Sequence, residues 1–170
     1  MNRRNILNLS AIAMLGLALM SGSADAKQKT LKQQIVGSWI FVGSTGKRPD
    51  GSPNWGPNPK GILILGANGQ YANMLLRSDI PKYAANNRLN GTADENKATV
   101  QGGIASYGTY TVNESDRSYT IQIEASSYPN WSGSKQTRTV ASVTADELKI
   151  NNPAPSIGGA ATVLTYKRAK

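Results

Sequence analysis

The sequence predicts an all-β protein, an antiparallel barrel or sandwich of seven or eight short strands with one short helix. Three observations lead to this class. Short runs rich in β-branched and aromatic residues recur along the chain, and several of them alternate between apolar and polar residues. Turn-forming residues separate these runs at close spacing. A capping-box signature, which marks a helix start, begins at Thr92.

The first 26 residues have the three parts of a secretory signal peptide. A positively charged start at Asn2-Arg3-Arg4 precedes an apolar run from Ala11 to Met20, and Ala24-Asp25-Ala26 is a small-x-small cleavage site. The apolar run is too short to span a bilayer, so we expect no transmembrane segment after its removal. We therefore expect export to the periplasm or the medium, with an uncleaved anchor as the rival interpretation.

Cleavage would divide the chain into a signal peptide and one exported domain. Residues 1–26 would be removed, residues 27–34 form a polar N-terminal extension that frays or makes one helical turn, and residues 35–170 form the barrel. The chain has no Cys, so the export is not that of a lipoprotein.

The first part of the barrel is predicted to contain a strand, a covering loop and a hairpin. Residues 35–44 are mostly β-branched or aromatic, which favours a strand. Residues 45–60 contain four prolines and Trp55, a composition that excludes a central strand and predicts a covering loop. Asn68-Gly69 lies between the two apolar runs of residues 61–77, which predicts a tight hairpin.

The second part begins with the short helix and continues as strands. Thr92 as the N-cap and Glu95 three residues later predict a helix over residues 93–100. Further strands are predicted at residues 104–112, 118–125, 136–143, 148–150 and 161–167. The turn at residues 128–133 contains Trp131, which a turn does not need. Such a Trp either plugs a barrel end or lines a ligand entrance.

Composition excludes several classes of chemistry. Without Cys or His, the chain cannot form disulfides, a Ser-His-Asp triad or an imidazole-based zinc site. We expect no metal, no cofactor and no assigned catalytic residue. The net charge is +9, and it becomes +8 if Arg3, Arg4 and Asp25 are removed with the signal peptide. Because the basic residues are scattered, we expect no nucleic-acid partner.

Several ordered motifs make the chain resemble a known family. The Gly-x-Trp opening in Ile35-Val36-Gly37-Ser38-Trp39 resembles that of lipocalin-like barrels. The further motifs follow in the order typical of the bacterial lipocalin-like domain family: residues 55–69, 74–81, 107–110 and 128–133. The resemblance covers nearly all of residues 35–168 and implies an antiparallel lipocalin-like barrel of about eight strands with an internal cavity. Relatives often carry His in the strand equivalent to residues 119–124, whereas this chain has none.

A barrel of this size either encloses one small ligand or is filled by its own side chains. The candidate ligand-binding residues are Trp55, Arg77, Tyr107, Tyr110, Asn130, Trp131 and Arg138. Arg77 and Arg138 would each clamp a ligand carboxylate or phosphate, or else form an ion pair within the protein or be solvated. For Arg77 the protein partner would be Asp79 or Glu124.

The aromatic candidates carry similar alternatives. Tyr107 and Tyr110 have opposite parity in their strand, and we place Tyr110 inward because its face is the more apolar. Its alternative role is packing with a satisfied hydroxyl. Trp39 is predicted to plug the bottom of the barrel, and Trp55 to act as a lid or a loop anchor.

These features favour a protein that binds a small hydrophobic or amphipathic ligand over an enzyme. The alternatives are an isomerase or cyclase acting on a hydrophobic substrate in the same cavity, or an envelope module without a ligand. In an enzyme, Glu124, Asp79 or a Tyr with a shifted pKa would supply acid–base chemistry. A cavity filled by side chains would contradict the binding hypothesis, and a buried carboxylate beside Tyr110 or Arg138 would favour the enzyme.

Overall fold

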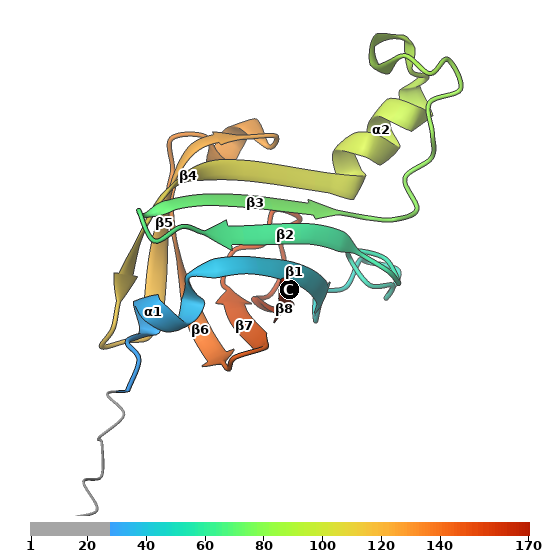
Figure 1. Ribbon diagram of the computed structural model, residues 1–170. Helices are drawn as coiled ribbons and strands as arrows, with labels where there is room; N and C mark the ends of the chain where they lie inside the picture. The colour runs from blue at the N-terminus through green and yellow to red at the C-terminus, as the bar shows by residue number, and fades with distance from the viewer. Residues whose placement is uncertain (1–27) are drawn as a thin grey trace, which may run out of the picture.

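Eight antiparallel strands close into a barrel in which each strand pairs with the next along the chain and β8 pairs with β1 (Figure 1). The computed structural model describes residues 28–170, so the predicted signal peptide lies outside the described residues. The strands are β1 (Gly37–Ser44), β2 (Lys60–Leu65), β3 (Gln70–Leu76), β4 (Gly103–Asn113), β5 (Ser118–Ser126), β6 (Lys135–Val143), β7 (Glu147–Asn152) and β8 (Thr162–Arg168). The barrel, rather than the sandwich, is therefore the fold.

The two ends of the barrel differ in the length of their connections. At one end, the closed end, the turns after β2, β4 and β6 are short. At the other, the open end, four longer segments join the strands: residues 45–59, 77–102, 127–134 and 153–161. Long loops at one end leave room for an entrance that short turns do not.

The predicted Asn68-Gly69 turn joins β2 to β3 at the closed end. Gly69 adopts φ +85°, a left-handed conformation that favours glycine. The Asn68 side chain accepts a hydrogen bond from the Gln70 amide at 3.1 Å. The register then pairs Leu65 with Tyr71, which keeps the apolar residues of both strands on the inner face.

A short helix, α1 (Leu31–Ile35), covers the closed end and corrects the predicted start of the first strand. Residue 35, expected in the strand, ends this helix, and β1 begins at Gly37. Thr30 and Gln33 form a capping box at the helix start. The Glu114 carboxylate accepts the Leu31 and Lys32 amides, at 2.6 and 3.0 Å, and so binds α1 to the β4–β5 turn.

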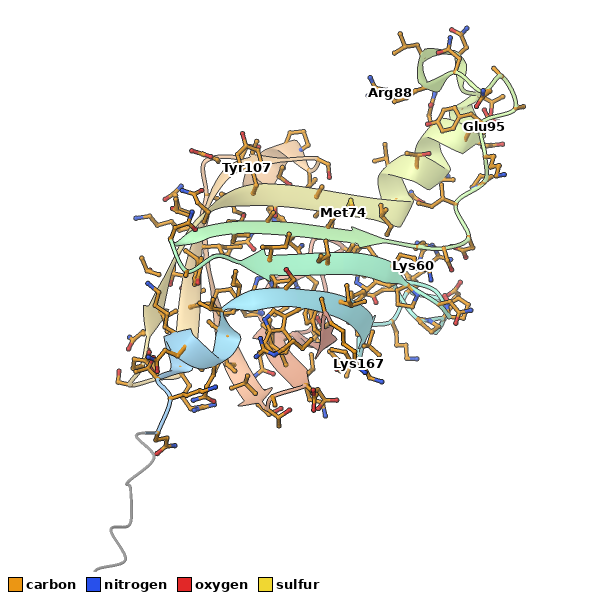
Figure 2. All side chains as sticks on the ribbon, in the orientation of Figure 1. Lys60, Met74, Arg88, Glu95, Tyr107 and Lys167 are labelled. Atoms are coloured by element: carbon orange, nitrogen blue, oxygen red, sulfur yellow. The ribbon has the colours of Figure 1, made fainter. Side chains whose placement is uncertain are left out.

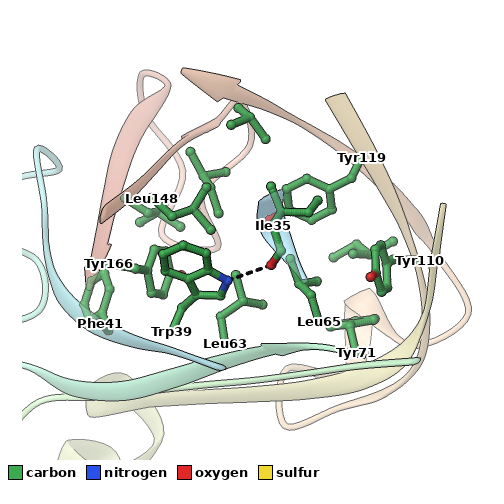
Figure 3. Packing of buried hydrophobic residues seen from close by; sticks show 14 of the residues in the cluster. Ile35, Trp39, Phe41, Leu63, Leu65, Tyr71, Tyr110, Tyr119, Leu148 and Tyr166 are labelled. Carbon is green, nitrogen blue, oxygen red and sulfur yellow. Dashed lines mark hydrogen bonds between the residues drawn. The ribbon is translucent and has the colours of Figure 1, made fainter. Parts of the chain in front are cut away.

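Trp39 fills the bottom of the barrel, as predicted (Figure 3). Its side chain is fully buried, and its indole N–H donates to the Ile35 carbonyl at 2.7 Å. The Arg168 guanidinium lies 4.0 Å from the indole ring centroid, a cation–π contact. Arg168 also donates to the Gln34, Val36 and Ala145 carbonyls, at 2.9, 3.1 and 2.5 Å. These contacts hold α1, β1 and the β6–β7 turn together.

The segment between β3 and β4 extends away from the barrel and carries α2 (Ala93–Gly102) (Figure 1). The predicted capping box of Thr92 and Glu95 is present, and the helix runs two residues further than expected. A single turn of 3₁₀-helix, η1 (Arg88–Asn90), precedes α2, and another, η2 (Pro129–Trp131), lies between β5 and β6. Within residues 28–170, neither α1 nor α2 is long and apolar enough to cross a membrane.

Candidate ligand-binding cavity

A cavity of about 700 Å³ lies inside the barrel and reaches its open end. All four long segments of the open end contribute to its mouth, through residues such as Arg48, Val100, Trp131 and Ile157. Its volume lies within the range of roughly 300–1,000 Å³ that is usual for small-molecule sites. Side chains therefore do not fill the barrel, which contradicts the alternative interpretation of a filled barrel.

The walls of the cavity are largely apolar because inward positions of neighbouring strands carry aliphatic residues. Leu63, Leu75, Ile104, Ile121 and Leu164 lie on β2, β3, β4, β5 and β8. Each of these side chains is at least nine-tenths buried. They give the cavity a surface suited to a hydrocarbon chain or ring system.

Two tryptophans stand at the mouth. Trp55, on the proline-containing β1–β2 segment, packs edge-on against Phe41 with ring centroids 6.1 Å apart. Trp131, in η2, packs edge-on against Tyr128 at 5.8 Å. Both residues are partly buried and line the cavity, so each anchors its own loop and also faces the entrance.

Arg138 projects from β6 into the cavity as a buried cation. Only 8% of the residue is exposed. One guanidinium N–H donates to Asn152 Oδ1 and another to Gln136 Oε1, the latter at 2.8 Å. Both partners are neutral, and no Asp or Glu within residues 28–170 forms an ion pair with Arg138. Because a guanidinium carries five donor hydrogens, Arg138 retains donors for a further acceptor.

The charge lining the cavity is entirely positive. Lys47 and Arg48 stand at the mouth and Arg138 lies inside, while no acidic residue of the described chain lines the cavity. Within residues 28–170, no Asp or Glu is buried. The site therefore favours an anionic group over a cationic one.

Four residues of the cavity lining each carry a buried oxygen atom that has no hydrogen-bond partner within residues 28–170. They are Asn54, Tyr71, Asn73 and Thr162. The Tyr71 hydroxyl lies beside the Ser106 side chain without reaching hydrogen-bond geometry. An unpaired buried polar atom costs free energy, about 1–3 kcal/mol, which a bound polar group would recover.

Tyr119 and Tyr166 line the cavity and belong to the buried cluster that also contains Trp39 (Figure 3). Burial raises the pKa of the Tyr119 hydroxyl to about 12, an effect that the nearby Arg138 charge opposes. Burial also raises the pKa of Tyr166. Both hydroxyls are therefore neutral at physiological pH and present hydrogen-bond donors to the cavity.

Comparison with known proteins identifies the family of the chain. Residues 36–169 match the family described as the lipocalin-like domain. The chain belongs to the lipocalin-like domain family. Among solved structures it is similar to a lipocalin-like protein from Bacteroides uniformis, at 13% identity and a TM-score of 0.44. That comparison covers 80% of this chain and 99% of the other. A comparison with curated proteins found no match.

Three of the residues that the sequence singled out as ligand-binding candidates line the lipocalin-like cavity: Trp55, Trp131 and Arg138. They come from the β1–β2 segment, η2 and β6. The barrel thus brings together residues up to 83 positions apart in the chain, from 55 to 138.

The other four candidates lie outside the cavity lining. Arg77 stands at the rim in an ion pair with Asp79, one of its predicted alternatives, with a contact of 2.7 Å from Nε. Tyr107 points outward from β4 and is half-exposed (Figure 2). Tyr110 points inward as predicted, but near the closed end, where its hydroxyl donates to the Gly66 carbonyl at 2.8 Å. Asn130 is exposed in η2.

Sequence reasoning missed most of the polar residues of the cavity. Asn73 and Thr162 could have been found, because they share parity with the inward residues Leu75 and Leu164 on their strands. Asn54 lies in an irregular loop, whose conformation no periodic pattern predicts. A hydrogen bond of 3.1 Å from the backbone N–H of Asn54 to the Gly46 carbonyl holds the residue in place.

Proposed function

We propose that this lipocalin-like protein binds a small, mainly hydrophobic ligand with an acidic head, and that Arg138 holds the head. The observation that supports this proposal best is a buried guanidinium whose partners in the described part of the chain are neutral, facing a cavity of about 700 Å³. Burying a cation is unfavourable unless an opposite charge compensates for it. A ligand carboxylate would supply that charge and accept two parallel hydrogen bonds.

The remaining features of the cavity support the same ligand class. The aliphatic residues of β2 to β5 suit an apolar tail, and the mouth residues Lys47 and Arg48 would attract an anion. The Tyr119 and Tyr166 hydroxyls, which burial keeps protonated, would add donors near the head group. These features make anionic amphiphiles better candidates than neutral or cationic ones.

The first test compares Arg138→Met with Lys135→Met, a control that removes an exposed cation from the same strand. Titration calorimetry with dodecanoate is expected to show binding to the wild type and to Lys135→Met, and binding at least about tenfold weaker to Arg138→Met. Arg138→Met also leaves Asn152 Oδ1 and Gln136 Oε1 without a donor, so circular dichroism and urea unfolding must first show that the variant is folded. Equal affinity of the two variants would contradict the role of Arg138.

A second test does not depend on a chosen probe. Native mass spectrometry of protein purified without detergent is expected to show a discrete additional mass that is lost on unfolding. Its composition would identify the class of ligand, and Arg138→Met should lack it. A bound species without an acidic group would contradict the proposed head-group chemistry.

We also propose that the protein is exported, because residues 1–26 have the charge, apolar run and cleavage site of a signal peptide. The expected mature protein starts at Lys27. Cell fractionation with mass determination of the purified chain tests this. A full-length chain in the cytoplasm would contradict it.

A further inference from the structure

A continuous polar wall runs from Arg138 towards the mouth of the cavity. Arg138 on β6 donates to Asn152 at the end of β7. Asn152 pairs in register with Thr162, the first residue of β8. Side chains of such directly opposed residues have Cβ atoms about 4.5–5.5 Å apart. Thr162 is thus the next side chain along the inner wall after the hydrogen-bonded pair of Arg138 and Asn152.

Asn54 of the β1–β2 segment completes this wall. Its amide and the Thr162 methyl group both approach the same point beside Gly46, where a Cβ would lie 2.7 Å from Asn54 Nδ2 and 2.9 Å from Thr162 Cγ2. The two side chains are therefore neighbours. Asn54 and Thr162 are 8% and 7% exposed, and both line the cavity.

The polar wall is incomplete, since Asn54 Oδ1 and Thr162 Oγ1 are buried without a partner in the described chain. A ligand hydroxyl would satisfy both, because it donates one hydrogen bond and accepts others. Its O–H would donate to Asn54 Oδ1, and its oxygen would accept from the Thr162 hydroxyl. An amine is a poorer fit, since its positive charge would lie close to Arg138.

We propose that the ligand is an amphiphilic hydroxy acid whose hydroxyl lies within a few bonds of its carboxylate, as in a beta-hydroxy fatty acid. This inference rests on the proposed function and adds a second polar group to the ligand. The carboxylate pairs with Arg138 and the adjacent hydroxyl pairs with Thr162 and Asn54. The tail lies against the aliphatic residues Leu63, Leu75 and Ile104.

The experiment compares three probes: dodecanoate, beta-hydroxydodecanoate and omega-hydroxydodecanoate. With the wild type we expect beta-hydroxydodecanoate to bind at least about tenfold more tightly than dodecanoate, because it pairs polar atoms that dodecanoate leaves unpaired. The omega isomer should bind no better than dodecanoate, since its hydroxyl is a whole chain length from its carboxylate.

Three variants test the residues directly. Thr162→Val should remove the preference for beta-hydroxydodecanoate over dodecanoate, so that the two acids bind to this variant with similar affinity. Thr162→Ser keeps the hydroxyl and should keep the preference. This result would show that the loss in Thr162→Val comes from the missing hydroxyl and not from a change in folding at this position. Thr165→Val makes the same substitution at an outward-facing position of β8 and should change neither affinity.

The outcomes separate this inference from the proposed function. If dodecanoate and beta-hydroxydodecanoate bind equally to the wild type, the hydroxy-acid inference is overturned and the acid-binding function remains. A preference for the omega isomer, or a preference that survives in Thr162→Val, also overturns it. If none of the three acids binds, the proposed function fails and the inference fails with it.

Discussion

Two arginines, Arg168 at the closed end and Arg138 in the cavity, have opposite kinds of environment. Arg168 is held in the protein by three backbone carbonyls and the Trp39 ring. Arg138 has two neutral side-chain partners and faces the cavity. The first arrangement uses the guanidinium to join chain segments, whereas the second leaves part of it for a ligand.

Arg168→Met is expected to lower the free energy of unfolding by about 3 kcal/mol, because it leaves carbonyls without donors and removes the cation–π contact. The matched control is Lys167→Met, which removes the neighbouring exposed cation and should change stability by less than about 0.5 kcal/mol. Urea unfolding measures both. Similar losses in the two variants would show that charge, rather than these contacts, is responsible.

At the residue scale, the sequence could restrict the candidates but could not place their partners. It allowed Arg77 either to bind an anionic group of a ligand or to form an ion pair within the protein. In the structure Arg77 forms an ion pair with Asp79. Strand parity correctly placed Tyr110 inward and Tyr107 outward. Parity gives only the face of a strand, so it could not tell that Tyr110 lies at the closed end, bonded to Gly66.

At the scale of the elements, the close approach of β4 to β5 depends on one glycine. In the β4–β5 pair the register shifts between Tyr107 and Gly108, a β-bulge. At Gly108 a Cβ would lie 2.0 Å from the Gln122 carbonyl oxygen, so no other residue fits without moving the backbone. The bulge therefore depends on this glycine.

Gly108→Ala is expected to lower the free energy of unfolding by about 3 kcal/mol or more, because the added methyl group overlaps the backbone of β5. Gly43→Ala is the control, since a Cβ on this β1 glycine would have no heavy atom within 4 Å. Its effect should be near zero or slightly stabilising. Thermal unfolding of both variants checks this, and comparable losses would contradict the proposed clash.

Element types were largely predictable, and the main error has an identifiable cause. The Asn68-Gly69 hairpin and the Thr92 helix start are encoded in a few adjacent residues, and both are present. At Ile35, β-branched composition indicated a strand. The Thr30 and Gln33 capping box and the Glu114 carboxylate stabilise a helix there instead. The capping box could be recognised in the sequence, but Glu114 lies 83 residues from Leu31 along the chain.

The buried tyrosines give the whole molecule a predictable response to alkaline pH. Tyr119 has a pKa of about 12 in the folded protein, above its ordinary value of 10.0. Below about pH 10 it is protonated in both states, so its contribution to stability is fully present there. Between about pH 10 and 12 the unfolded chain loses this proton first. Each such tyrosine then lowers the free energy of unfolding by roughly 1.4 kcal/mol per pH unit.

Tyr119→Phe should therefore make the loss of stability above about pH 10 less steep, by the contribution of one tyrosine. Urea unfolding at several pH values measures the slope. Tyr107→Phe is the matched control, because it removes the hydroxyl of a half-exposed tyrosine on the outer face. An unaltered slope in Tyr119→Phe would mean that this hydroxyl ionises equally in the folded and unfolded chains.

The sequence by itself determined the all-β class, most strand and turn positions, the membership suggested by the ordered motifs, and the lack of any His- or Cys-based chemistry. These properties depend on residue type and local spacing. Only the tertiary structure decided that the barrel encloses a cavity, that Arg138 has no acidic partner among residues 28–170, and that Asn54 and Thr162 lie side by side. The physical reason is that closing the barrel joins distant strands, and no local pattern records which side chains then meet.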